Sequence, residues 1–387
     1  MVIHGAEPFY NSDRPISKKN KAMQVNIRLL ENKIVPEVLR FFNTAQNDKF
    51  QANNRSAEEF DWLFIKSFFK PAIYVVATES EYDEIIGTNA AIFIPMISNN
   101  GQHVMTVKGE DTLLSLDKMI GLGKRDILKE LSEVIAEKSK DENVLFIWGF
   151  TPAKKAFQRC GFKIITQIKG SFYVTRPLKF YKNRIALFPQ LKLNKKFQLF
   201  GFSWYNYLNN ILKSTRSGGI SFKSIGFDEV DEKVLLSFLP KNVYTTFLSK
   251  DFLKWRIQEN PSPLKYGFLE FRDNQKQIVA YFIYSSNKEN IFFVEQFLFH
   301  VQFLDHKKIR IIKLALNYCR KQKAIMVRAL GLSHNLLNIK EMELLSRSGF
   351  HFFNNPEESY LIFKDLTDSN IKPEDIYLSR LNTQGIK

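Results

Sequence analysis

The sequence predicts an α/β (α+β) chain of two domains that repeat one order of strands and helices. The first observation is size, because 387 residues that are 44% hydrophobic and 25% charged can bury the core of two domains. The second is a set of motifs in the first half that return in the second half. The third is that apolar strand runs alternate with amphipathic helices in both halves. Together these observations favour a tandem duplication of one mixed unit.

The internal repeat is visible in short motifs. QRCGF at 158–162 returns as SRSGF at 346–350, a shift of 188 residues, and LD at 116–117 returns as LD at 304–305 at the same shift. SFYV at 171–174 likewise returns as SYLI at 359–362. Farther upstream, SAEEFDW ending at Trp62 resembles SKDFLKW ending at Trp255, at a shift of 193. Loops of different length in the two copies would explain the change of shift.

Hydrophobic periodicity then gives the elements of each copy. In the first copy it predicts helices at 34–42 and 60–69, followed by strands at 72–78, 84–94 and about 111–116. An amphipathic helix comes next, with Ile127, Leu128, Leu131, Val134 and Ile135 on one stripe. The copy ends with a strand at 143–150, a short helix at 153–160, and strands at 162–168 and 171–178. In the second it predicts strands at 266–271, 278–284, 291–299 and 324–330, and a helix with Ile309, Ile312, Leu316 and Cys319 on one side.

The stretch DKMIGLGKRDIL at 117–128 is a glycine-bearing turn between a strand and a helix. The first amides of a helix lack partners within it, and the peptide dipoles concentrate positive potential there. Gly121 and Gly123 leave room for a close approach to the backbone, and Lys118, Lys124 and Arg125 add positive charge. This combination predicts a binding site for a phosphate or pyrophosphate group.

The spacing Lys118-x-x-Gly121-x-Gly123 resembles the pyrophosphate loop of the GNAT superfamily of N-acetyltransferases. WGFTPAKKAFQRCGF at 148–162 is similar to the second signature of that family, in which a strand, a short helix and a Gly-Phe close the acetyl-coenzyme A cleft. The resemblance covers about 23–178 and, more weakly, the chain from 224 onward. It implies two GNAT-like domains, each a mixed, mainly antiparallel sheet flanked by helices.

This resemblance implies a division of the chain and a site for acetyl-CoA. Residues 1–22 are expected to be a disordered tail or a remnant of expression, 23–178 the N-terminal GNAT domain with the acetyl-CoA site, 179–223 a basic and aromatic linker, and 224–387 a degenerate GNAT-like domain. The residues expected to bind the cofactor are Leu116, Asp117, Lys118, Ile120, Gly121, Leu122, Gly123, Lys124, Arg125 and Phe157.

Three departures from the family pattern affect the chemistry. Lys118 keeps the charge of the first loop position but lacks the planar fork of arginine. Phe157 stands where many members carry a tyrosine that protonates the leaving thiolate, so the acid is expected to be water or another group. In the second copy, DHKKIR at 305–310 has no glycine, and this half is therefore expected to hold the acceptor rather than the acetyl donor.

Direct acetyl transfer to an amine needs a carboxylate or a water chain that accepts the proton of the amine. Glu110 and Asp111 are candidates because they enter the strand before the loop, although VKGEDT can also be read as a plain turn. Glu295 in the aromatic strand of the second copy lies either on a solvated edge or in a functional cleft. Arg328 is a candidate contact for the acceptor, with a buried ion pair as the alternative.

The net charge of +16 is concentrated in the middle of the chain, where 143–227 contains fifteen Lys and Arg and no Asp or Glu. Either 176–196 is a solvated linker, which we favour, or it binds an anionic partner such as phospholipid head groups, a pyrophosphate-linked carrier or RNA. The aromatic segment 197–212 is read as a helix that packs the two domains together, with a helix lying on a membrane surface as the alternative. Peripheral membrane contact through 176–212 thus stays open.

The apolar runs are too short for a membrane span, and the N-terminus lacks the apolar region of a secretory signal. With only Cys160 and Cys319, the chain is expected in a reducing, cytoplasmic setting. The six histidines show no metal-ligand spacing, so no metal is expected.

The sequence therefore predicts an acetyl-CoA-dependent N-acyltransferase that acts on a primary amine. From the resemblance alone, that amine is an amino sugar in surface-polysaccharide or cell-envelope synthesis. One alternative is a FemAB-like transferase that uses aminoacyl-tRNA, against which the glycine turn argues. The other is a non-catalytic, ligand-binding GNAT-like protein, which Phe157 and the degenerate second loop favour.

Overall fold

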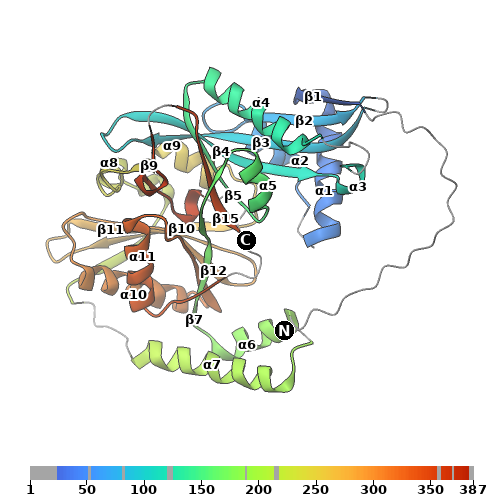
Figure 1. Ribbon diagram of the computed structural model, residues 1–387. Coiled ribbons are helices and arrows are strands. Elements are labelled where there is room, and N and C mark those ends of the chain that lie inside the picture. The colour runs from blue at the N-terminus through green and yellow to red at the C-terminus, as the bar shows by residue number, and fades with distance from the viewer. Residues whose placement is uncertain are drawn as a thin grey trace.

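The computed structural model describes residues 24–50, 54–80, 83–119, 125–187, 190–212, 218–354, 359–367 and 370–382. The tail predicted at 1–22 and the glycines of the predicted loop, within 120–124, lie outside the described residues. The described chain forms two mixed, mainly antiparallel sheets with helices packed on them (Figure 1). The predicted α/β class is confirmed.

The first sheet runs in the order β1 (Val25–Leu29), β2 (Ile73–Glu79), β3 (Glu84–Ile97), β4 (His103–Leu114), β5 (Val144–Thr151), β15 (Tyr360–Asp365) and β6 (Lys163–Gln167). On this path β4 and β5 are parallel, and the other neighbours are antiparallel. Two short strands, β9 (Tyr244–Thr246) and β16 (Ile376–Tyr377), extend it from β3.

Helices cover both faces of this sheet. Alternate residues of a strand point to opposite faces, so each strand contributes to the core on both sides. Val75 and Ala77 of β2 pack in the core that includes the apolar stripe of α4 (Ile127–Asp141). Tyr74 and Val76 pack instead in the core that includes Val38 of α1 (Val35–Phe50). The near-continuous apolar run of β2 is therefore explained by burial on both faces.

The second sheet runs in the order β14 (His351–Asn354), β7 (Lys169–Val174), β13 (Met326–Gly331), β12 (Ile291–Phe299), β11 (Ile278–Ser286), β10 (Lys265–Arg272) and β8 (Ser221–Ile225). Helix α10 (Asp305–Lys321) covers it and buries Ile312, Leu316 and Cys319, as the helical periodicity predicted. The remaining helices are α2 (Ala57–Phe60), α3 (Leu116–Met119), α5 (Lys154–Arg159), α6 (Pro177–Leu187), α7 (Leu193–Leu212), α8 (Glu232–Ser237), α9 (Lys250–Leu253) and α11 (Leu336–Arg347).

The two sheets exchange one strand each. β7 comes from the first half of the chain but lies between β13 and β14 of the second sheet. β15 comes from the second half but lies between β5 and β6 of the first sheet. These are the strands that contain the repeated SFYV and SYLI motifs. The division predicted at 178 and 224 therefore does not coincide with the division between the sheets.

A pair of tryptophans marks where the two copies meet. Trp62 and Trp255 stack with their ring centroids 5.0 Å apart. Each indole N–H donates to the backbone carbonyl of the other residue, at 3.0 and 3.4 Å. Both lie in π-helical turns, η2 (Asp61–Ile65) and η5 (Lys254–Gln258), that follow serine-capped helices. The contacts are reciprocal between equivalent positions of the two copies, as expected for a duplicated unit.

The segment after β7 forms a helical hairpin of α6 and α7. Helix α7 packs on β7, and Phe202 contacts Phe172 of β7 and His351 of β14. The hairpin thus lies on the second sheet, at the lower edge of the molecule in Figure 1. The expectation that 197–212 packs the two domains together is wrong, because α7 does not lie between the two sheets.

Candidate active site

The first sheet forks between its two parallel strands. β4 and β5 pair up to Gly109 and Gly149, after which β4 continues to Leu114 without pairing to β5. A Cβ atom on Gly149 would lie 3.3 Å from the carbonyl oxygen of Gly109, so glycine permits the close approach of the strands at this point. Beyond the fork lies a cavity of about 130 Å³. Its lining includes Asn89, Glu110, Thr112, Ser132 and Thr151 on the polar side and Trp148, Phe157, Phe162 and Ile362 on the apolar side.

A β-bulge shapes the wall of this cavity. Thr88 pairs with Leu113 and Ala90 with Glu110, so Asn89 of β3 faces both Asp111 and Thr112 of β4. Asp111 takes a left-handed backbone conformation with φ of +46°, which aspartate adopts more readily than most residues. A bulge redirects the side chains on either side of it. The predicted carboxylates Glu110 and Asp111 are therefore in the wall of the fork, and VKGEDT is part of a strand rather than a plain turn.

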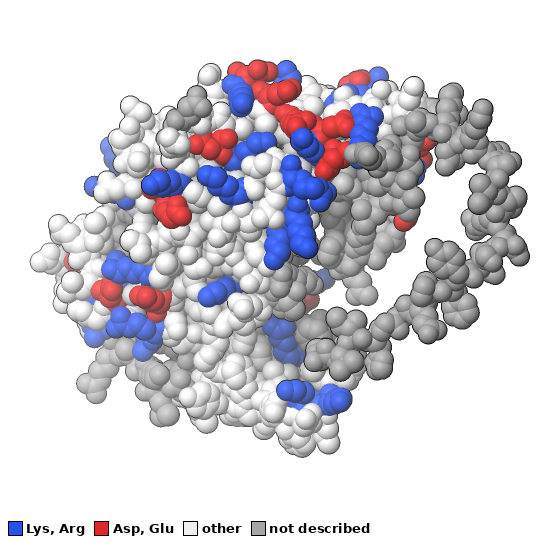
Figure 2. All heavy atoms as spheres, viewed as in Figure 1, with Lys and Arg blue, Asp and Glu red and all other residues white. Residues whose placement is uncertain are grey.

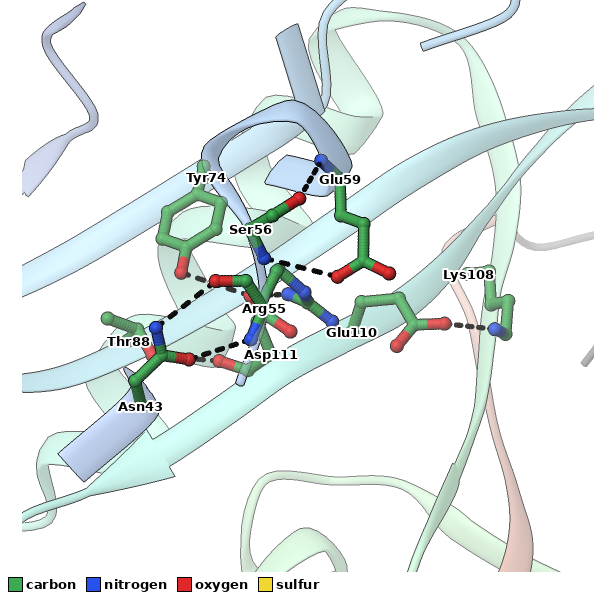
Figure 3. Close-up of polar contacts among 9 residues, drawn as sticks. All are labelled: Asn43, Arg55, Ser56, Glu59, Tyr74, Thr88, Lys108, Glu110 and Asp111. Atoms are coloured by element: carbon green, nitrogen blue, oxygen red, sulfur yellow. Dashed lines mark hydrogen bonds and ion pairs between the residues drawn. The ribbon is translucent and has the colours of Figure 1, made fainter. Parts of the chain in front are cut away.

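The carboxylate of Asp111 is engaged by other protein groups (Figure 3). Arg55 forms an ion pair with it, and the hydroxyl of Tyr74 donates to it at 3.3 Å. Asn43 of α1 holds the backbone of Arg55 through two hydrogen bonds, at 2.8 and 3.1 Å. Burial raises the pKa of Asp111, and Arg55 opposes this change. These contacts make Asp111 a buried support for the bulge.

Both predicted carboxylates line the cavity, and Glu110 is the more exposed of the two. Its side chain is 17% exposed and forms an ion pair with Lys108, whose side chain is only 2% exposed. Burial lowers the pKa of Lys108, and the carboxylate of Glu110 opposes this change. The ion pair with Lys108 orients the side chain of Glu110 (Figure 3). Of the two neighbouring acids, Glu110 is thus the better placed to accept a proton from a bound molecule.

A second polar group in the cavity was not found from the sequence. The hydroxyl of Thr112 donates to Asn89 at 2.8 Å, and the amide of Asn89 donates to Ser132 of α4 at 3.3 Å. Asn89 and Ser132 are buried. The sequence did contain a signal for this group. Asn89 lies in an otherwise apolar strand and Ser132 lies beside the apolar stripe of a helix, where apolar residues would be expected. The hydroxyls of Thr112 and Ser132 line the same cavity as Phe157.

Phe157 lies in the wall of this cavity. Its ring is buried and packs edge-on against Phe162, with centroids 5.3 Å apart. A phenyl ring offers no proton. Nearby Cys160 is also buried, and burial raises the pKa of its thiol. The thiol form is therefore favoured.

The predicted phosphate-binding turn is only partly within the described residues, because 120–124 are not described. At its start, Lys118 of α3 forms an ion pair with Glu84. At its end, Arg125 forms an ion pair with Glu130 at 2.7 Å and donates to the carbonyl of Val25 at 3.0 Å. To bind a phosphate group, Lys118 and Arg125 would each have to release the acidic side chain with which they pair.

The N-terminus of α4 itself is already capped. The side chain of Asp126 accepts a hydrogen bond from the backbone N–H of Lys129 at 3.2 Å. This cap pairs one of the first backbone N–H groups of α4.

The second sheet has an equivalent fork, but it is closed. β12 and β13 pair up to Phe293 and Arg328, and a bulge follows at Glu295. The space beyond this fork measures only about 10 Å³, and residues of α11, among them Glu341, Met342 and Leu345, line it. Protein side chains therefore occupy the place that is open in the first sheet. The expectation that this half holds the acceptor stays a prediction.

Glu295 lies in this closed fork and not in the first one. Ser285 donates a hydrogen bond to its carboxylate, and Arg380 lies 3.5 Å from the same oxygen. Glu295 follows the last paired residue of its fork by two positions, as Asp111 does in the first sheet. The structure thus does not bring Glu295 together with Glu110, and it gives Glu295 a buried, arginine-paired position like that of Asp111.

Arg328 is half-buried in β13, with its guanidinium 5.8 Å from the ring centroid of Phe293. Burial lowers its pKa to about 10, and the nearby cations Arg380 and Arg184 add to the effect. Among the described residues no carboxylate forms an ion pair with Arg328. The structure does not support the ion-pair alternative, and a role in binding the acceptor stays a prediction.

Comparisons with known proteins identify the fold. No protein-family model matches the sequence, and no curated protein matches it. Among solved structures, a probable N-acyltransferase from Enterococcus faecalis V583 has a TM-score of 0.58 at 9% identity, over 89% of this chain and 73% of its own. N-myristoyltransferase from Saccharomyces cerevisiae, with bound myristoyl-CoA and inhibitors, has a TM-score of 0.56 at 12% identity, over 95% and 87%.

A tandem GNAT protein from the clavulanic acid biosynthesis pathway has a TM-score of 0.55 at 12% identity, over 90% of this chain and 100% of its own. Each likeness extends over both halves of the chain. The protein therefore has the fold of these tandem GNAT proteins, as the two signatures in its first half suggested. At these identities the likeness identifies the fold and leaves the substrates open.

Proposed function

Starting from this tandem GNAT fold, we propose that the protein is an acyl-CoA-dependent N-acyltransferase whose donor site is the fork of the first sheet. The observation that carries the proposal is the difference between the two forks. The first contains an open cavity with Glu110, Thr112 and Ser132 in its wall, and the second is filled by side chains of α11. One donor site per chain follows.

The residues of the fork have distinct roles in this proposal. A bound acyl-CoA supplies an activated acyl group as a thioester. Glu110 accepts the proton that the substrate amine loses as its nitrogen forms the new bond, directly or through one water. The hydroxyl of Ser132 or Thr112, or a water that it holds, donates a proton to the departing sulfur in place of the tyrosine that Phe157 replaces. Arg55 and Asp111 keep the bulge in position.

The size of the cavity favours a short acyl group such as acetyl. Its volume of about 130 Å³ is small beside the roughly 300–1,000 Å³ of pockets that enclose whole small molecules. The aromatic rings of Trp148, Phe157 and Phe162 line it. We expect kcat/KM to fall as the acyl chain lengthens from acetyl to myristoyl. Equal or greater activity with the long chain would contradict the assignment to acetyl.

For the acceptor we propose a primary amine, with amino sugars of surface-polysaccharide or cell-envelope synthesis as the first class to assay. The support for amino sugars is the resemblance of the turn and the Gly-Phe signature to GNAT enzymes, and Arg328 stays a predicted contact for the acceptor. A panel of free and nucleotide-linked amino sugars, polyamines and peptides tests this choice through release of free CoA thiol.

Binding of CoA tests the donor site independently of the acceptor. A ligand at a hundredfold excess over its Kd stabilises the folded state by about 2.7 kcal/mol and raises the melting temperature. We expect this for the wild-type chain but not for Gly121→Glu, which adds bulk and negative charge to the turn. The matched control is Lys307→Glu in the equivalent turn of the second copy, which should retain the response. Loss of the response in both variants, or in neither, contradicts the proposal.

A further inference from the structure

The hairpin of α6 and α7 exposes an unusual amount of apolar surface. Seven of the fourteen exposed large apolar side chains in the described part of the chain belong to it: Leu178, Leu193, Phe197, Phe200, Phe202, Tyr205 and Leu208. Leu193 and Phe197 are 69% and 68% exposed. Large contiguous apolar patches on a soluble protein usually indicate a binding surface.

The exposed residues of α7 form a stripe. Leu193, Phe197, Tyr205 and Leu208 recur at helical spacing along α7, which places them on one side. Leu199, Ser203 and Asn206 recur on the side that packs inward, where Ser203 and Asn206 are fully buried. Helix α7 therefore differs from an ordinary surface helix, because its inner face includes buried polar residues and its solvent-facing stripe is apolar.

The hairpin is anchored to the second sheet by aromatic contacts, so its outer face has a defined orientation. Phe180 of α6 packs on Phe172 of β7, with ring centroids 5.5 Å apart. Phe180 also shares a core cluster with Val174 of β7 and Ile325. The apolar stripe is thus presented outward from the second sheet.

The charge around this stripe has one sign. From Arg176 to Leu212 the chain contains seven Lys and Arg and no Asp or Glu. In Figure 2 the lower part of the molecule, where the hairpin lies in Figure 1, shows white and blue atoms, and the acidic side chains lie mainly higher up. No helix in the described residues is long and apolar enough to cross a bilayer. The combination suits a surface that lies on a bilayer.

We propose that the α6–α7 hairpin docks the protein on a bilayer that contains anionic phospholipids. Exposed Leu, Phe and Tyr side chains enter the boundary between head groups and acyl chains, and the lysines contact the anionic head groups. A nucleic acid would use the cations but leave the leucines exposed to water. The bilayer is therefore the occupant that uses both the apolar and the cationic groups.

Flotation of the full-length protein with vesicles tests the proposal. We expect binding to vesicles of phosphatidylcholine with one third phosphatidylglycerol, and at least tenfold weaker binding to phosphatidylcholine alone. Lys195→Gln should weaken partitioning about fivefold, which corresponds to about 1 kcal/mol per lysine near the surface. Binding should also weaken as salt is raised, because the screening length falls from ~10 Å at 0.1 M to ~3 Å at 1 M.

Matched variants separate docking from a general effect on the protein. Phe197→Glu should abolish vesicle binding without changing the melting temperature, since the side chain is exposed. Leu336→Glu, at a leucine that is 83% exposed outside the hairpin, should retain binding. Absence of binding to either vesicle, equal loss in both variants, or a concentration-dependent dimer that Phe197→Glu dissociates in the absence of lipid would overturn the proposal.

Discussion

At the scale of single residues, the two forks share a buried carboxylate with an arginine partner. Asp111 pairs with Arg55, and Glu295 pairs with Arg380. Removal of one partner of a buried ion pair is costly because it leaves the other charge uncompensated. Both acids were candidate bases in the sequence, where a buried ion pair and a catalytic carboxylate look alike. The difference depends on partners distant in sequence, which composition and spacing do not reveal.

Asp111→Asn should destabilise the protein by about 3 kcal/mol, because Arg55 stays largely buried without its partner. Asparagine accepts the left-handed backbone, so the loss reports on charge rather than on strain. Urea unfolding measures it. Asp83→Asn is the control, since Asp83 is also left-handed and pairs with Arg28 at 2.8 Å but is exposed; there the change should stay below about 1 kcal/mol. Similar losses in both variants would contradict the role given to Asp111.

Phe157→Tyr should raise kcat, because it places a phenol at the position from which many related enzymes protonate the leaving thiolate. General acid catalysis contributes about 10²–10⁴-fold in enzymes that depend on it, so a gain toward the lower end is expected where hydroxyls already supply protons. Steady-state kinetics with acetyl-CoA measure the change. A fall in kcat at unchanged stability would show that the ring of Phe157 has a different role.

At the scale of elements, periodicity predicted most of the strands and the two long helices that cover the sheets. Ile312, Leu316 and Cys319 are buried as their spacing required. Periodicity missed the full length of β4, which extends from His103 and alternates only weakly, and it missed the π-helical turns after Ser56 and Ser249. Periodicity did not predict the fork between β4 and β5, and only the family resemblance pointed to a site in this region. Where two strands separate depends on how they pair, which the local sequence does not show.

The closed second fork gives an element-level prediction about pH. Burial raises the pKa of Glu341 to about 7, and its carboxylate accepts a hydrogen bond from Tyr377 at 3.0 Å. Because the pKa of Glu341 is higher in the folded state than in the unfolded state, protonation of Glu341 favours folding. Its contribution to the free energy of unfolding is therefore complete below the ordinary glutamate pKa of about 4.3 and is lost as pH rises through about 7.

We therefore expect the melting temperature to fall between pH 5 and pH 8 in the wild-type protein. Glu341→Gln, which stays neutral, should show a smaller fall over that interval. Differential scanning calorimetry across pH measures both. The control is Glu343→Gln, on the same helix α11. The assignment fails if the two variants have the same pH dependence as the wild type.

At the scale of the whole molecule, the strand exchange joins the two copies into one folding unit. The repeat predicted the duplication and the equivalence of β7 and β15, but it placed each strand with its own copy. Sequence similarity cannot decide which sheet a strand enters, because both sheets offer the same neighbours. The stacked pair of Trp62 and Trp255 adds a second tie between the copies.

A chain that ends at residue 178 should consequently not fold as a stable domain. It lacks β15, so β5 and β6 would expose unpaired edges, and its own β7 would have no sheet to enter. The full-length protein should unfold in a single cooperative transition. Circular dichroism on both chains measures this. A cooperative transition in the half-chain at the melting temperature of the full chain would show that the strand exchange is dispensable.

The central claim is that an acyl-CoA occupies the fork of the first sheet and not that of the second. Hydrogen–deuterium exchange with and without CoA tests it most directly, since the backbone beyond each fork is reported separately. The account predicts slower exchange at 109–114 and 148–152 when CoA is added and no change at 293–297 and 328–331. Protection confined to the second fork, or absent from both at saturating CoA, would contradict it.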